Sequence, residues 1–162
     1  RLAVENLADD PVGSDPQVLR RVIERFASRW LGVCLDTGHA YLVGNLVESL
    51  QVLEDLIISF HLADNDGTRD LHLQPPYGSI PWPAFREIFW QMGFEEPVVI
   101  EARPWANAGY AQQQLEVAAL LQGKLLTLDV DQRTVTVRCS RCGHVCIDDD
   151  ESIWCACSRR TR

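Results

Sequence analysis

The sequence lacks long hydrophobic runs and has little positive charge. No apolar stretch approaches the roughly 20 residues that a membrane-spanning helix needs, and no secretory signal segment stands near the start. The chain has 15 Lys and Arg residues against 23 Asp and Glu, a formal net charge of -8. Because nucleic-acid-binding proteins usually present a basic face, this balance argues against a nucleic-acid partner. We expect a soluble, cytoplasmic protein with no membrane partner.

Cysteine is scarce through most of the chain, where Cys34 stands alone, but five cysteines crowd the last quarter. Without a secretory signal, such a cluster indicates a metal site rather than disulfides. Cys139-x2-Cys142 and Cys155-x-Cys157 would supply four thiolates for a closed tetrahedral Zn²⁺ site. The second pair is one residue shorter than the usual C-x2-C. Unmetallated, incidental thiols are therefore the alternative interpretation.

Four apolar segments each end at a carboxylate or an imidazole. The segments are Leu2–Leu7, Leu31–His39, Ile57–Gly67 and Pro97–Pro104. Their ends supply, in order, Glu5, Asp36 with His39, His61, and Glu101. Segments that are apolar throughout are typical of strands in a parallel sheet covered by helices. Polar residues at the ends of such strands are how an α/β barrel builds an active site.

Helical patterns separate the four segments. Asp15-Pro16 predicts a helix start, and Asn45 is positioned to cap the next helix. Gly93 stands where a C-terminal cap glycine ends a third helix, and residues 109–122 predict a fourth. Four strand–helix units make half of an eightfold barrel. The sequence therefore predicts an α/β fold, the C-terminal half of a (β/α)8 TIM barrel.

The chain begins with Arg1, inside a strand-like segment, so we expect the C-terminal part of a longer polypeptide. A half barrel leaves two open sheet edges, which either the missing N-terminal half or a homo-oligomer would complete. From Leu125 the sequence alternates apolar and polar residues, which predicts a β-hairpin around residues 131–133. We therefore expect a half barrel at 1–123 and a small β module that resembles a zinc ribbon at 124–162.

The strand ends and the long polar loop offer a mixed set of metal donors. They are Glu5, Asp36, His39, His61, Asp70, His72 and Glu101. Carboxylates with imidazoles suit Zn²⁺, Mn²⁺, Co²⁺ or Mg²⁺, and three imidazoles favour Zn²⁺ or Mn²⁺. Several carboxylates at one barrel mouth would repel one another, and a divalent cation relieves that repulsion. Any one of these residues alone is better explained as a solvated loop residue or a structural hydrogen-bond partner.

Five motifs together resemble the C-terminal half of the xylose-isomerase-like barrel superfamily: VENL, CLDTGH, HLADNDGTRDLH, YGSIPW and VIEAR. This superfamily includes sugar and sugar-phosphate isomerases and epimerases, and the apurinic-site endonucleases. The resemblance runs from Ala3 to about Arg103. It implies a divalent-metal site made of Glu5, Asp36, His61 and Glu101.

By the same resemblance, the chain would be part of a metal-dependent sugar or sugar-phosphate isomerase or epimerase. The metal would polarise the carbonyl of an open-chain sugar, and Glu5 and Glu101 would transfer a proton through an enediolate. His39 would bind the substrate, and Arg69 or Arg103 would meet a phosphate or carboxylate.

Two other functions stay open at this point. In the endonuclease branch His39, Asp70 and His72 are further ligands of a zinc cluster that activates water against a phosphodiester. Two more ligands of that cluster come from the first half of the barrel. The third hypothesis is a non-catalytic scaffold that works through its zinc ribbon.

The loop also departs from the family pattern Pro-Pro-Gly-x-Gly. It reads Pro75-Pro76-Tyr77-Gly78, which predicts a stiffer loop.

Overall fold

The computed structural model describes residues 1–96, 98–102 and 110–121, together with the backbone of four short strands nearer the C-terminus. The chain divides into two compact units, Arg1–Gln113 and Gln114–Arg162. The strands of the first unit are β1 (Leu2–Glu5), β2 (Leu31–Asp36), β3 (Ile57–Leu62) and β4 (Val98–Ile100). Its helices are α1 (Pro16–Phe26), α2 (Thr37–Leu42), α3 (Leu46–Leu53), the 3-10 turn η1 (Glu54–Leu56) and α4 (Trp82–Gln91). Helix α5 (Tyr110–Leu121) crosses the division.

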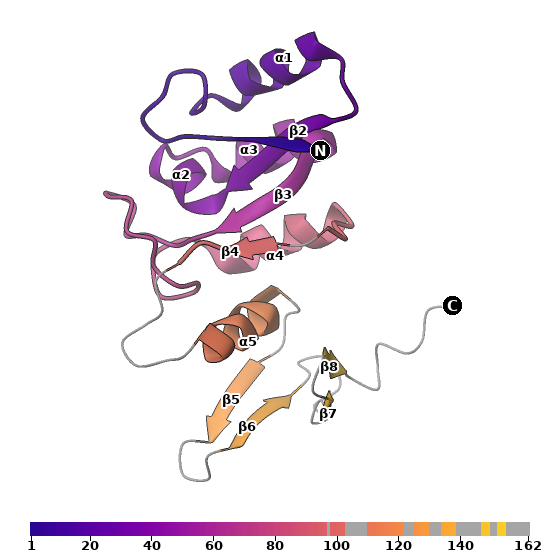
Figure 1. The fold of residues 1–162 in the computed structure, drawn as a ribbon. Helices are drawn as coiled ribbons and strands as arrows, with labels where there is room; N and C mark the ends of the chain where they lie inside the picture. The colour runs from indigo at the N-terminus through magenta and orange to yellow at the C-terminus, as the bar shows by residue number, and fades with distance from the viewer. Residues whose placement is uncertain are drawn as a thin grey trace. The chain divides into compact units, whose positions relative to one another are not determined.

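The first unit is built on one sheet in the order β1-β2-β3-β4, with every neighbouring pair parallel. The arrowheads of β2, β3 and β4 point to the same side of the view in Figure 1, so the carboxyl ends of the strands share one edge. This arrangement confirms the predicted α/β fold with a parallel sheet. It also brings the polar strand ends into one neighbourhood.

The core lies between the sheet and its helices. Val33 and Leu35 of β2 are fully buried, and Leu50 of α3 and Leu19 of α1 pack in the same apolar layer. Phe60 of β3 adds an aromatic cluster, with its ring centroid 5.9 Å from that of Phe85, 5.4 Å from Phe89 and 4.9 Å from Phe94. Edge-to-face packing of this kind adds to the gain from burial. The strands that carry the site are thus held on a rigid base.

Helix starts follow the sequence at two of the predicted places. Asp15 caps α1, because its carboxylate accepts from the backbone N–H groups of Gln17 at 2.8 Å and Val18 at 3.2 Å. Asn45 precedes α3 as predicted, yet its side chain makes no capping bond. Instead its amide donates to the Ser14 carbonyl at 2.7 Å and accepts from Ser49 Oγ at 3.1 Å. Asn45 therefore ties α3 to the segment that precedes α1.

The loop between β3 and α4 is organised around Asp64, which is fully buried. Its carboxylate accepts from four N–H groups: those of Asn65 (2.9 Å), Gly78 (3.0 Å) and Ile80 (3.1 Å), and the Trp82 indole (2.6 Å). Such bonds stabilise a buried charge that would otherwise be costly. A Cβ at position 78 would collide with this carboxylate, so the backbone approach requires glycine there.

Short polar side chains form the turn around Gly67. The Gly67 N–H donates to Asn65 Oδ1 at 2.8 Å, and Gly67 adopts φ +78, a conformation that glycine reaches without strain. The Thr68 N–H donates to Asp66 Oδ1 at 2.9 Å in the same way. The loop is therefore ordered by its own short polar side chains.

In the second unit, β5 (Leu125–Asp129) pairs antiparallel with β6 (Thr134–Arg138), in agreement with the predicted hairpin. Strands β7 (Ile147–Asp149) and β8 (Ser152–Trp154) form a second antiparallel pair. The candidate zinc ligands Cys139, Cys142, Cys155 and Cys157 lie outside the described residues, so the zinc-ribbon site stays a prediction. Among the residues that the structure describes, no helix is long and apolar enough to cross a membrane.

We predict that Asp64→Asn destabilises the first unit by about 1–3 kcal/mol, because an amide NH₂ would face backbone N–H donors that now share a carboxylate. Urea unfolding followed by circular dichroism measures this loss. The exposed Asp66→Asn is the matched control and should change the free energy of unfolding by no more than about 0.5 kcal/mol. Equal effects of the two substitutions would contradict the anchoring role of Asp64.

Candidate metal centre

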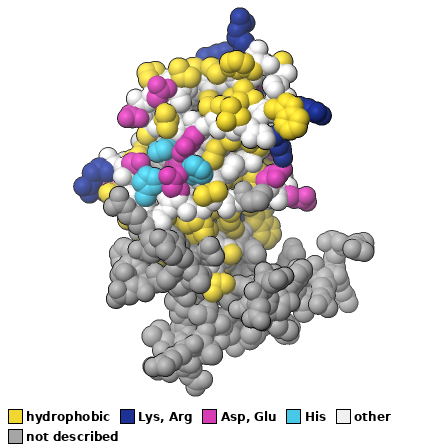
Figure 2. Space-filling view, viewed as in Figure 1, with side chains coloured by type: hydrophobic (Ala, Val, Ile, Leu, Met, Phe, Trp, Pro, Cys, Tyr) yellow, Lys and Arg dark blue, Asp and Glu magenta, His cyan; other side chains and the backbone are white. Residues whose placement is uncertain are grey.

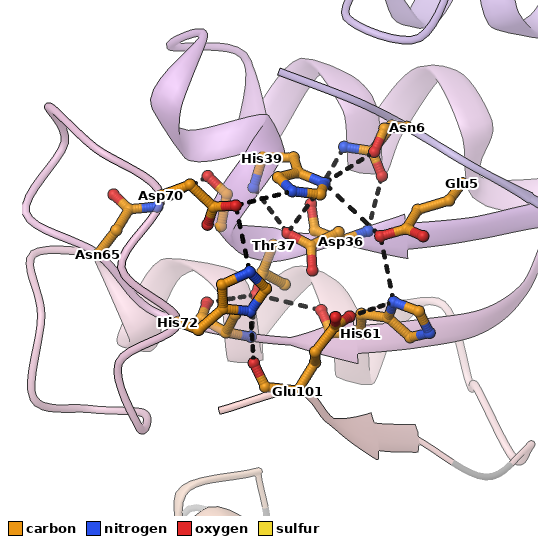
Figure 3. A network of polar contacts seen from close by, with 12 residues as sticks. Glu5, Asn6, Asp36, Thr37, His39, His61, Asn65, Asp70, His72 and Glu101 are labelled. Carbon is orange, nitrogen blue, oxygen red and sulfur yellow. Dashed lines mark hydrogen bonds and ion pairs between the residues drawn. The ribbon is translucent and has the colours of Figure 1, made fainter. Parts of the chain in front are cut away.

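The parallel register sets four donor side chains side by side at the carboxyl edge of the sheet. Asp36 and His61 are direct partners across β2 and β3, and the Glu101 N–H extends the β3–β4 pairing to the Leu62 carbonyl at 3.1 Å. One ligand atom from each of Glu5, Asp36, His61 and Glu101 lies within 4.8 Å of the others. Figure 3 shows these side chains directed toward one another from the ends of separate strands.

His61 lies between two carboxylates that it cannot satisfy together. Its Nδ1 is 3.2 Å from Glu5 Oε1, with hydrogen-bond geometry, and 2.6 Å from Glu101 Oε2. Since Glu101 Oε2 is buried and has no hydrogen-bond partner, the second contact is an ion pair without hydrogen-bond geometry. A single ring nitrogen offers one proton or one lone pair. A cation among the three groups would accept a lone pair from each.

Asp36 is the most deeply buried member of the set, with 1% of its side chain exposed. Its Oδ1 accepts from the His39 N–H at 2.7 Å and caps α2, whereas its Oδ2 is buried without a hydrogen-bond partner. Burial raises the pKa of Asp36 above its usual value, although the His39 N–H and imidazole partly offset the effect. A charged oxygen buried without a partner is costly, so Oδ2 is suited to a cation. Together with Glu101 Oε2, it shows that the donor set fits a divalent metal.

His39, Asp70 and His72 form a second convergence beside the first. His39 Nε2 is 3.3 Å and His72 Nε2 is 3.2 Å from the same oxygen, Asp70 Oδ2. The opposite nitrogens are bound to main-chain carbonyls: His39 Nδ1 lies 2.9 Å from the Asn6 oxygen and His72 Nδ1 lies 3.0 Å from the Glu101 oxygen. Since a carbonyl only accepts, each Nδ1 carries a proton and each Nε2 faces Asp70.

The charges around these two imidazoles outweigh their burial. Burial lowers the pKa of His39, but Asp36, the Asn6 carbonyl and Asp70 raise it above the usual histidine value. Burial also lowers the pKa of His72, and the Glu101 carbonyl together with Asp70 reverses the effect. His72 adopts a left-handed backbone with φ 47, uncommon for a residue with a side chain. The loop thus holds His72 in a strained conformation beside the strand-end carboxylates.

The two convergences adjoin each other. His39 Nδ1 is 3.6 Å from both Glu5 Oε1 and Asp36 Oδ1. Figure 2 shows imidazoles and carboxylates gathered in a single patch on this face of the molecule. The predicted donors are therefore all neighbours, but they fall into a group of four and a group of three.

Only one of the two predicted arginines is among the described residues. Arg69 is an exposed loop residue, and its guanidinium lies 3.7 Å from Asp66 Oδ2 in a surface ion pair. Arg103 lies outside the described residues. Their assignment to a substrate phosphate or carboxylate stays a prediction.

Three further polar residues brace the site and were not predicted as site residues. Thr37 Oγ1 donates to the Ala63 carbonyl at 2.7 Å, and Asn65 Nδ2 donates to the Gly38 carbonyl at 2.8 Å. These bonds join α2 to the end of β3. The third residue is Asn6, which bonds to the backbone of Asp36. All three lie inside motifs quoted from the sequence: Asn6 follows Glu5 directly, Thr37 follows Asp36 directly, and Asn65 stands four positions after His61.

Similar proteins were found at low identity and over part of their length. An uncharacterized protein of Sinorhizobium fredii is 32% identical over 106 residues, which cover 62% of this chain and 33% of that protein. A protein of Mycoplasmopsis pulmonis named probable endonuclease 4 is 29% identical over 124 residues, 68% of this chain and 44% of that protein. The chain therefore spans less than half the length of these relatives.

Solved structures share the fold. A D-tagatose 3-epimerase-like protein superposes with a TM-score of 0.65 at 26% identity, covering 75% of this chain and 46% of the other. The IolI protein, whose crystal structure has a bound zinc atom, superposes with a TM-score of 0.63 at 19% identity, covering 76% and 49%. The model of one family, described as the xylose isomerase-like TIM barrel, matches residues 1–120. By its strand-end site and by this match, the chain belongs to the xylose isomerase-like TIM barrel family.

Proposed function

We propose that this chain supplies the metal-binding half of a divalent-metal-dependent sugar or sugar-phosphate isomerase or epimerase. The observation that carries the proposal is the convergence of Glu5, Asp36, His61 and Glu101, with two buried carboxylate oxygens left without hydrogen bonds. The likeness to a D-tagatose 3-epimerase-like structure supports a sugar substrate. Because the chain covers 46% of that structure, the remainder of a barrel would complete the pocket.

The donor set favours particular metals. Three carboxylates and one imidazole suit Mn²⁺ and Zn²⁺, and they are compatible with Co²⁺ or Mg²⁺. Bound there, the ion would polarise the substrate carbonyl as a Lewis acid. A separate structural Zn²⁺ in the cysteine-rich tail remains part of the proposal.

The protein would supply the proton transfers through Glu5 and Glu101. These carboxylates project from β1 and β4, on either side of His61. Each has two oxygens, so one can hold the metal while the other takes or returns a proton. One carboxylate would remove the proton from the carbon beside the carbonyl, giving an enediolate, and the other would protonate the opposite face or the next carbon. His39 would hydrogen-bond the substrate at the edge of the patch.

The alternative is a zinc-dependent phosphodiesterase of the apurinic-site endonuclease type. Its specific support is the second convergence, in which two imidazoles present Nε2 to one carboxylate oxygen, Asp70 Oδ2. Their Nδ1 atoms are held by main-chain carbonyls, an arrangement typical of metal-binding histidines. The relative named probable endonuclease 4 supports the same branch.

Metal content distinguishes the hypotheses. For the isomerase we expect one ion in the first unit, and Asp70→Asn should not change that number. Elemental analysis counts the bound ions. The protein used carries Cys139→Ser and Cys142→Ser, because these substitutions remove the candidate zinc site of the tail. A second ion that disappears with Asp70→Asn would favour the endonuclease, to be checked by cleavage of an abasic-site duplex. If the protein with both cysteine substitutions bound no metal at all, the result would favour the non-catalytic scaffold that works through its zinc ribbon.

We predict opposite effects of Asp36→Asn on stability and on metal binding. Because the folded pKa of Asp36 is raised above 3.8, its ionisation destabilises the metal-free fold as the pH rises above that value. Removing the charge should raise the melting temperature at pH 7 by about 2–4 °C, for a gain of about 1 kcal/mol. The gain should vanish in acid, where the carboxyl is protonated in both states.

The same variant should no longer be stabilised by Mn²⁺, because a ligand oxygen is lost. Thermal melts with and without Mn²⁺ measure both effects, with the exposed Asp9→Asn as the control. A variant that is less stable than the parent without metal and still responds to Mn²⁺ would rule out the assigned role of Asp36.

Glu101→Gln should abolish proton transfer while the fold stays intact. Loss of a general acid–base group lowers the rate by about 10²–10⁴-fold. Incorporation of solvent deuterium at the carbon beside the carbonyl of D-tagatose and related ketoses, in the full-length protein with Mn²⁺, measures the step. The exposed Glu95→Gln is the matched control. If exchange in Glu101→Gln equalled that of the control, the acid–base assignment would be wrong.

A further inference from the structure

Asn6 extends the pairing of β1 with β2 through its side chain. Its Nδ2 donates to the Asp36 carbonyl at 3.1 Å, and its Oδ1 accepts from the Asp36 N–H at 2.6 Å. One amide thus satisfies both backbone groups of a single residue, as a neighbouring strand would. Asn6 is 5% exposed, so these bonds are shielded from water. They fix the backbone from which the Asp36 carboxylate projects.

The backbone of Asn6 acts on a second member of the site. Its carbonyl oxygen lies 2.9 Å from His39 Nδ1, which places the ring proton on Nδ1 and leaves Nε2 facing Asp70. Both Oδ1 and Nδ2 of Asn6 are bonded to the Asp36 backbone, so the orientation of the Asn6 backbone carbonyl is restricted as well. Asn6 therefore joins three candidate site residues, being the chain neighbour of Glu5 and a direct partner of Asp36 and His39 (Figure 3).

Few residues could replace this amide. Aspartate would set an oxygen against the Asp36 carbonyl and add charge beside a group of carboxylates. Serine is too short to reach both backbone groups, and alanine leaves both buried and unpaired. Position 6 requires a side chain that carries one donor and one acceptor at the same distance from its backbone. This requirement indicates that Asn6 orients the site residues that it contacts.

We propose that Asn6 is a positioning residue that aligns the Asp36 carboxylate for the metal and fixes the ring of His39 in its Nδ1–H form. The part concerning the metal rests on the proposed function. The part concerning His39 does not, since it follows from contacts within the protein alone.

The first experiment compares Asn6→Ala with Asn45→Ala in the full chain. Asn45 is a matched control, because its amide also makes two hydrogen bonds, to the Ser14 carbonyl and the Ser49 hydroxyl, neither of which belongs to a candidate ligand. Mn²⁺ titration followed by electron paramagnetic resonance should show binding weaker by about 10–100-fold for Asn6→Ala. Asn45→Ala should lower the melting temperature and bind Mn²⁺ as the parent chain does. Equal affinities of the two variants would overturn the metal part.

The second measurement needs no metal. At a pH at which the ring is neutral, nitrogen-15 NMR of the histidine rings should show His39 as a single Nδ1–H form in the parent chain and in Asn45→Ala, and as a mixture of the two neutral forms in Asn6→Ala. Asn6→Ser, a smaller change, gives the same test if Asn6→Ala does not fold. Unchanged His39 signals would overturn the His39 part. If the parent chain itself bound no Mn²⁺, the proposed function would fail, whereas the NMR result would still decide the role of Asn6.

Discussion

The repulsion among three carboxylates at one edge of the sheet is the constraint on which the site depends. Parallel pairing brings Glu5, Asp36 and Glu101 together whatever their charges, because consecutive parallel strands end at the same edge. Two like charges 4 Å apart repel by about 4 kcal/mol at the effective dielectric typical near a protein surface. The imidazole of His61 can neutralise part of this charge, but its one contacting nitrogen cannot satisfy two carboxylates. A divalent ion, as proposed for this site, would remove the conflict.

The rest of the unit holds this unfavourable arrangement in place. Thr37 and Asn65 join α2 to the end of β3. Asp64 accepts hydrogen bonds from four N–H groups and so closes the loop that carries Asp70 and His72. Nearly every polar atom in these braces has a partner. The buried oxygens without hydrogen bonds include one each on Asp36 and Glu101, in the candidate site itself. A strained, charged site on a well-bonded frame is what a preorganised binding centre requires.

The sequence was sufficient for features that depend on local pattern. Apolar runs ending at polar residues predicted the parallel sheet and the edge where Glu5, Asp36, His61 and Glu101 meet, and Asp15 with Pro16 predicted the start of α1. The sequence pattern did not predict α2. This helix is short, contains Gly38 and is capped by Asp36, which is also the last residue of β2. The roles of Asn6 and Asp64 were beyond reach because their partners lie 30 and up to 18 positions away. Nothing in local sequence specifies such pairs.

The two groups of donors are coupled through the backbone of the first. The carbonyl that orients His39 belongs to the neighbour of Glu5, and the carbonyl that orients His72 belongs to Glu101 itself. Any shift of either strand end would therefore turn an imidazole as well as displace a carboxylate. Protons and cations compete for the same Nε2 lone pairs beside Asp70, and the acidic surroundings raise the pKa of both rings. Protonated rings would bind oxygen atoms of a substrate, whereas neutral rings would bind a second cation. Among the described residues, the two proposed functions, an isomerase and a phosphodiesterase, therefore differ in what would occupy the space around Asp70.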